Sequence, residues 1–205
     1  MKKSLIVIIS FLCAGEMFSQ KDSYFPQVFF DKKQAEAQLG YGKSIIEGVA
    51  FTREKRNVPF TMGMVKAKMG KKHVARPNTV IMLFPVTEYF TEFYNLRRKI
   101  ESSKKQVLMS KEAFAVRREA YTDDYGRFKF ENLKVGKYYI ETIVDFTAVG
   151  SYKKQTGTST AYNVYGTPLY STPIYETFFY DYEDSHRESK FVEVKKDGQV
   201  IEIKL

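Results

Sequence analysis

The chain has 205 residues, with 33 lysines and arginines against 24 aspartates and glutamates, which gives a formal net charge of +9. Its 43% hydrophobic content is sufficient for one globular core. The single cysteine, Cys13, excludes an intrachain disulfide framework.

The first twenty residues differ from the rest of the chain. Lys2 and Lys3 precede an apolar run over residues 4–14. This run is too short to span a bilayer, which needs roughly 20 residues, but it is typical of a secretory signal peptide. We therefore expect residues 1–20 to be removed on export, with a membrane anchor as the alternative. The mature chain would reach the periplasm, the outer-membrane surface or the medium.

The next elements lead into a β domain. Residues 21–43 form a lead-in with a short helix that Asp31 caps. A β-branched run at 44–52 predicts the first strand, and the basic segment 53–73 predicts a loop or an irregular edge hairpin. The apolar run 79–86 predicts a strand with both faces covered.

A helical insertion is expected at about 87–117. Phe93, Leu96, Ile100 and Val107 recur at steps of 3, 4 and 7, which describes one face of a helix. No later stretch is apolar enough to cross a membrane.

Strands return after residue 118. The turn 123–126 contains Asp and Gly, and Phe128 and Phe130 then alternate with polar residues, which indicates a half-buried strand. Near the C-terminus, the Asp197-Gly198 pair lies between two alternating runs and predicts a hairpin. Many short strands separated by turns favour a sandwich.

The segment 122–142 resembles the repeated hallmark of carboxypeptidase regulatory-like domains, also described as transthyretin-like or starch-binding-like folds. The matching residues are Thr122, Asp123, Gly126, Phe128, Phe130, Leu133, Gly136, Tyr138 and Ile140. The resemblance implies an immunoglobulin- or prealbumin-like β-sandwich over residues 44–205, with insertions at 87–117 and 150–189. A chain with this domain type and a leader that ends in Phe-Ser-Gln resembles secreted proteins of the Bacteroidetes.

The positive charge is concentrated in one part of the chain. Residues 53–118 contain sixteen lysines and arginines and five acidic residues. Such a region can attract acidic glycans, anionic lipid or nucleic acid, although export disfavours nucleic acid. Solvated helix and loop faces are the alternative. The candidate anion-binding face consists of Arg97, Arg98, Lys99, Lys104 and Lys105.

A tyrosine-rich hairpin is expected in the extension 150–189. Seven of the fifteen tyrosines lie between residues 152 and 182. Exposed rings among hydroxyl and carboxylate groups would suit a glycan or a protein interface, whereas rings packed over the sheet would be structural. The candidate ligand-binding residues are Tyr162, Tyr165, Tyr170, Tyr175 and Tyr180.

The sequence offers no catalytic site and no cofactor motif. His73 and His186 are far apart and have no metal-ligand spacing, and neither a nucleophile motif nor a phosphate loop occurs. We therefore expect a non-catalytic module of the cell envelope that binds a protein or supports an assembly. The alternative is a carbohydrate-binding module that uses the tyrosines of 152–182.

Overall fold

The computed structural model describes residues 21–62 and 64–205, so the expected signal peptide lies outside the described residues. The helices in this part are α1 (Lys32–Gln38), α2 (Glu88–Ile100) and α3 (Lys111–Ala115). The strands are β1 (Asp22–Tyr24), β2 (Ser44–Val49), β3 (Phe51–Asn57), β4 (Lys66–Val74), β5 (Val80–Pro85), β6 (Lys105–Val107), β7 (Arg118–Tyr121), β8 (Arg127–Leu133), β9 (Gly136–Tyr162), β10 (Pro168–Val194) and β11 (Val200–Lys204).

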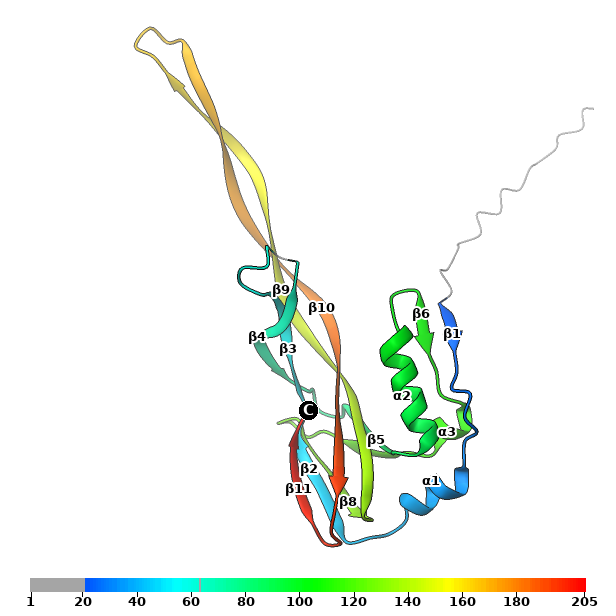
Figure 1. Ribbon diagram of the computed structural model, residues 1–205. Coiled ribbons are helices and arrows are strands. Elements are labelled where there is room, and N and C mark those ends of the chain that lie inside the picture. Colours follow the sequence, from blue (N-terminus) through cyan, green and yellow to red (C-terminus); the bar gives the residue numbers. More distant parts are fainter. Residues whose placement is uncertain (1–20, 63) are drawn as a thin grey trace, which may run out of the picture.

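Two sheets form the body of the molecule (Figure 1). One has the order β10-β9-β5-β7 and the other the order β11-β2-β8. Their inward side chains form a common core, which includes Ile46, Ile81, Leu83, Phe128, Phe130, Tyr138, Ile140, Val144 and Ile203. The mainly-β sandwich with a helical insertion and a long hairpin, predicted from the sequence, is confirmed.

The root of β9 is buried on both faces. Tyr138 and Ile140 point into the sandwich, whereas Tyr139 and Glu141 point to the side where α2 packs. Helix α2 begins after Thr87, whose side chain accepts a hydrogen bond from the Phe90 N–H at 3.2 Å. Its apolar face and β9 share a second core, formed by Phe84, Phe90, Phe93, Val107 and Tyr139.

The turn that opens β8 shows why the 122–140 motif has its residue types. The Asp123 Oδ1 atom accepts hydrogen bonds from the backbone N–H groups of Tyr125 (2.9 Å) and Arg127 (2.8 Å). Gly126 has φ +70°, a conformation that favours glycine. The two phenylalanines of β8 are buried, which stabilises the fold by about 1.5–3 kcal/mol for each ring as an upper estimate. These residues therefore build the scaffold.

The prediction of a hairpin at Asp197-Gly198 is wrong. Gly198 does adopt φ +76°, but β10 and β11 belong to different sheets, and β11 pairs in parallel with β2. The Lys43 N–H donates to Asp197 Oδ1 at 3.0 Å, and the Ile45 N–H donates to the Gln199 carbonyl at 2.9 Å. These long-range bonds direct the turn across the sandwich.

The helical insertion is also shorter than its apolar spacing suggests. Helix α2 ends at Ile100, and Glu101 already has an extended ψ of 128°. Val107 is buried in the short strand β6, which pairs in parallel with β1. No helix among the described residues has the length and apolarity to cross a membrane.

Strands β9 and β10 continue far beyond the body as a two-stranded hairpin (Figure 1). Each has 27 residues, so at about 3.4 Å per residue the ribbon is ~90 Å long. The extension therefore continues two body strands without interruption.

Candidate functional site

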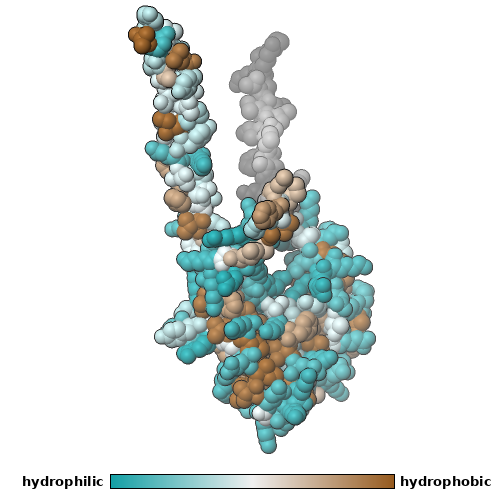
Figure 2. Space-filling model, turned by 60° about the vertical axis from the view of Figure 1, so that its left-hand side comes forward, coloured by the Kyte–Doolittle hydropathy of each residue, from teal (hydrophilic) through white to brown (hydrophobic). Residues whose placement is uncertain are grey.

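The projecting part of the hairpin, residues 150–182, is here called the arm. Its side chains are exposed along nearly the whole length, and hydrophobic groups are visible along the ribbon and at its tip (Figure 2). The exposed large side chains include Tyr152, Tyr162, Val164, Tyr165, Leu169, Tyr170, Ile174, Tyr175, Phe178, Phe179, Tyr180 and Tyr182. The alternative that the rings pack over the sheet is therefore wrong.

Four rings on one face of the arm form what we call the aromatic strip: Tyr152, Phe178, Tyr180 and Tyr182. Tyr152 is the cross-strand partner of Phe178, and the two rings stack with centroids 5.6 Å apart. The Tyr152 and Tyr180 centroids lie 6.2 Å apart, and those of Tyr180 and Tyr182 lie 6.0 Å apart. The rings are 37–51% exposed, so they support one another while their outer surfaces face solvent.

Gly150 makes room for the strip. It lies opposite Tyr180, and a Cβ atom at Gly150 would be 2.5 Å from Cζ of the Tyr180 ring. The absence of a side chain therefore allows this ring to lie across β9. Phe178, Tyr180 and Tyr182 are two residues apart and so share one face of β10.

The five tyrosines predicted as ligand-binding residues do not form one surface. Tyr180 belongs to the aromatic strip, whereas Tyr170 and Tyr175 point to opposite faces of β10 because their positions differ in parity. Tyr162 and Tyr165 lie at the tip, 62% and 89% exposed. The list of five candidate residues left out Tyr152 and Tyr182, although both belong to the predicted segment 152–182, and it left out Phe178. The period of two in β10 and the pairing with β9 would have identified all three.

Both edges of the arm carry features that oppose pairing with another strand. Pro168 and Pro173 have no N–H and leave gaps in the donor row of the β10 edge. Strand β9 has Lys153 and Lys154, followed by a register shift at which Thr156 has no partner. Lysines, prolines and bulges are the usual protection of exposed edges. The faces of the arm, more than its edges, are therefore available for recognition.

A buried polar group anchors the root of the arm to strand β3. The Thr52 hydroxyl lies 3.0 Å from His186 Nδ1 and also bonds Glu188. Burial, and then the charge of Lys55, lower the pKa of His186. The rings of His73 and His186 lie 4.6 and 5.0 Å from that of Phe146. The fold thus brings the two histidines together, but it uses them for packing at the root.

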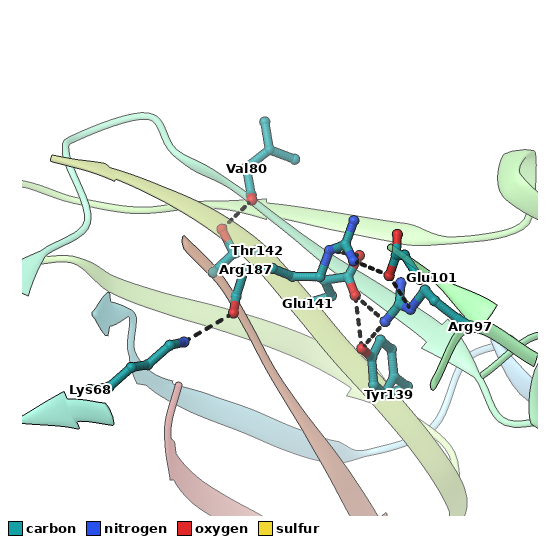
Figure 3. A network of polar contacts seen from close by, with 8 residues as sticks. All are labelled: Lys68, Val80, Arg97, Glu101, Tyr139, Glu141, Thr142 and Arg187. Atoms are coloured by element: carbon teal, nitrogen blue, oxygen red, sulfur yellow. Dashed lines mark hydrogen bonds and ion pairs between the residues drawn. The ribbon is translucent and has the colours of Figure 1, made fainter. Parts of the chain in front are cut away.

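Arg97 is not part of an exposed anion-binding face, which corrects the sequence prediction for this residue. Its side chain is 9% exposed and donates to Glu141 at 2.6 Å and to Tyr139 at 2.5 Å (Figure 3). Burial lowers its pKa, but the hydrogen bond and charge of Glu141 outweigh burial, so the net pKa is raised. Glu101 links this pair to Arg187 on β10, at 2.9 Å.

The other members of the predicted anion-binding face are exposed. Arg98 and Lys99 lie in the last turn of α2, where positive charge complements the helix dipole. Lys104 precedes β6 and Lys105 begins it, and Lys105 Nζ lies 5.6 Å from the Tyr24 ring centroid. Arg98, Lys99 and Lys105 therefore have local structural roles.

An open cleft of about 920 Å³ lies on the body. Its lining has four acidic and four basic side chains and one exposed ring, Tyr121: Glu47, Glu119, Asp123 and Glu202 with Arg127, Lys129, Lys190 and Lys204. Within residues 21–62 and 64–205, no group of three or more His, Cys, Asp or Glu side chains is placed to hold a metal ion. The acidic and basic side chains of the cleft balance, so its lining favours neither anionic nor cationic ligands.

Comparisons with known proteins concern the fold. No family model matches the chain, and no curated protein matches its sequence. Its fold is similar to the crystal structure of a Pseudomonas aeruginosa protein that has been proposed to bind carbohydrate. The TM-score is 0.53 at 18% identity, over 87% of this chain and 99% of the other. The match supports the β-sandwich architecture.

Proposed function

We propose that this chain is an exported, non-catalytic β-sandwich module that binds carbohydrate through the aromatic strip of its arm. The observation that carries the proposal is a row of four half-exposed rings on a projecting ribbon. The C–H faces of sugars stack on aromatic rings, and tyrosine hydroxyls add hydrogen bonds at the edge of the platform. The carbohydrate role proposed for the structurally similar protein agrees with this assignment.

The motif over residues 122–140 supports placing the body among the carboxypeptidase regulatory-like domains. In this structure the motif shapes a turn and fills the core, and the aromatic strip lies outside it. The leader over residues 1–20 supports export to the envelope or beyond. We assign the function to the arm, since a fold by itself does not specify a function.

The test is a glycan array with the mature chain and the variant Tyr152→Ala/Tyr180→Ala/Tyr182→Ala. These rings make no contact with the body core, so the variant should unfold at nearly the same temperature but lose retention on the glycans that the natural chain binds. Retention that survives the three substitutions would exclude the strip as the binding surface.

A finer variant uses the glycines of the arm. Gly150→Ala places a methyl group against the Tyr180 ring and should displace it, whereas Gly157→Ala has only Ile174 Cδ1 nearby, at 3.8 Å. We expect weaker glycan binding for the first variant and unchanged binding for the second. Equal effects of the two would show that the position of the Tyr180 ring is irrelevant.

A second candidate function is protein binding by the distal arm. Residues 155–175 contain no charged side chain, and Val164 and Tyr165 at the tip are 93% and 89% exposed. Uncharged surfaces rich in tyrosine are favoured at protein interfaces. In that case, Val164→Ser/Tyr165→Ser should abolish capture of an envelope protein and leave glycan retention unchanged.

A further inference from the structure

The hairpin formed by β3 and β4 is the most one-sided charged element of the described chain. Residues 51–74 contain seven lysines and arginines and one acidic residue, Glu54. Two cross-strand pairs join like charges, Arg53 with Lys72 and Lys55 with Lys68. We call the basic face the set Arg53, Lys55, Lys66, Lys68 and Lys72.

Like charges at directly paired positions destabilise a hairpin. Lys68 is the one member of the basic face with a carboxylate partner among the described residues, Glu188 at 2.6 Å. Lys55, Lys66 and Lys72 are exposed, and no described carboxylate lies within ion-pair distance of them. The hairpin thus retains a repulsion that an external polyanion would relieve.

Strand β10 connects the basic face to the aromatic strip. The Lys68 ammonium group contacts the Arg187 carbonyl and the Glu188 carboxylate, five and six residues along β10 from Tyr182. Glu54 is the acidic residue within the basic hairpin itself, and it is held by His73 at 2.9 Å. A chain molecule bound along the strip can therefore reach the lysines without crossing the body.

We infer that the ligand of this site is an anionic polysaccharide, with sugar rings on the aromatic strip and carboxylate or sulfate groups on the basic face. This inference rests on the proposed carbohydrate binding and specifies its ligand class. It moves the anion-binding surface from α2, where Arg97 is buried, to the hairpin of β3 and β4.

A lipid surface is less compatible with the shape of the molecule. The tip of the same hairpin exposes Phe60, Met62 and Met64, which would suit a bilayer. However, the arm extends well past this tip in the same direction (Figures 1 and 2). A flat membrane approaching the tip end-on would meet the arm first, whereas a linear polymer can lie along both hairpins.

The experiment compares the affinity of the mature chain for polygalacturonate and for dextran as a neutral polymer. We expect preference for polygalacturonate, a steep loss of affinity between low and physiological salt, and a roughly tenfold weakening in Lys55→Gln/Lys66→Gln/Lys72→Gln. The control Arg98→Gln/Lys99→Gln/Lys104→Gln removes the same charge from the end of α2 and should bind almost as well as the natural chain.

The outcomes separate the two proposals. Equal binding of dextran and polygalacturonate would overturn the inference and leave carbohydrate binding in place, whereas a chain that binds no glycan would refute the proposed function itself. If both triple variants weakened polygalacturonate binding equally, net charge alone would explain the effect. That result would overturn the assignment of binding to the basic face. Tighter binding to vesicles of anionic phospholipid, lost in the Lys55/Lys66/Lys72 variant, would assign the face to lipid instead.

Discussion

Single residues of this protein show how burial decides between structure and function. Arg97 belongs to a basic run in the sequence, yet its guanidinium group is enclosed by Glu141 and Tyr139 and fixes α2 to β9. Burial, and then the charge of Glu141, raise the pKa of the Tyr139 hydroxyl far above its usual range. The phenol therefore stays neutral and serves the network as a hydrogen-bonding group.

Truncation of Arg97 should be severe. Arg97→Ala leaves the Glu141 carboxylate buried without its partner, and we expect a loss of about 3–5 kcal/mol in the free energy of unfolding. The neighbouring Arg98→Ala should change it by less than about 0.5 kcal/mol, because that side chain is exposed. Urea denaturation measures both values. Similar losses of unfolding free energy in the two variants would contradict a stabilising role of the Arg97–Glu141 pair.

His186 predicts a pH dependence of stability. Its folded-state pKa is lowered from 6.5, so the unfolded chain takes up the proton first as the pH falls. Stability should therefore be complete above about pH 7 and decline as the pH falls through about 6.5, the ordinary pKa of histidine. Lys55, Lys68, Asp184 and Glu188 are the charged groups around the ring. The variant His186→Gln should flatten this decline in urea titrations, and an unchanged slope would exclude His186 as its source.

At the scale of elements, the arm is a two-stranded ribbon outside any core. A two-stranded hairpin alone is marginal in water, and here its root is held by the Thr52–His186 contact and by the pairing of β9 with β5. The stacked rings of the aromatic strip then stabilise the first exposed part. Prolines, lysines and a bulge limit pairing of its edges with other chains.

Removal of the edge protection should cause self-association. We expect Lys153→Thr/Lys154→Thr/Pro173→Thr to form dimers or fibres, because the β9 edge loses two positive charges and the β10 edge gains an N–H donor at residue 173. Size-exclusion chromatography with light scattering measures the effect, and Lys195→Thr/Lys196→Thr, outside the arm, is the control. Monomeric behaviour of the triple variant would show that these residues do not protect the edges.

The elements predicted best were those whose signals are local. The Asp123-Gly126 turn and the alternation of Phe128 and Phe130 depend on neighbouring residues, and the structure shows both. The Asp197-Gly198 pair shows the limit of such local signals. The turn forms as predicted, but the strand that follows it, β11, pairs with the distant β2 and not with β10. The site was harder still to predict, since it requires the register of β9 against β10 as well as the positions of the tyrosines.

At the scale of the whole molecule, the sandwich is a base from which a long two-stranded ribbon projects. The body contains the core and the charged cleft, and the arm carries the aromatic strip (Figures 1 and 2). The basic hairpin of β3 and β4 lies at the junction between them. The proposed carbohydrate site therefore lies outside the motif of residues 122–140 and outside the charged cleft of the body.

The most direct test removes the arm and keeps the body. Gly150 and Tyr180 are paired, so residues 151–179 can be replaced by an Asn-Gly turn that closes the shortened hairpin. We expect this shortened chain to fold with a cooperative thermal transition and to retain none of the glycans that the intact chain binds on the array. Undiminished retention by the shortened chain would place binding on the body, with the Tyr121 cleft as its site, and would contradict glycan binding by the arm.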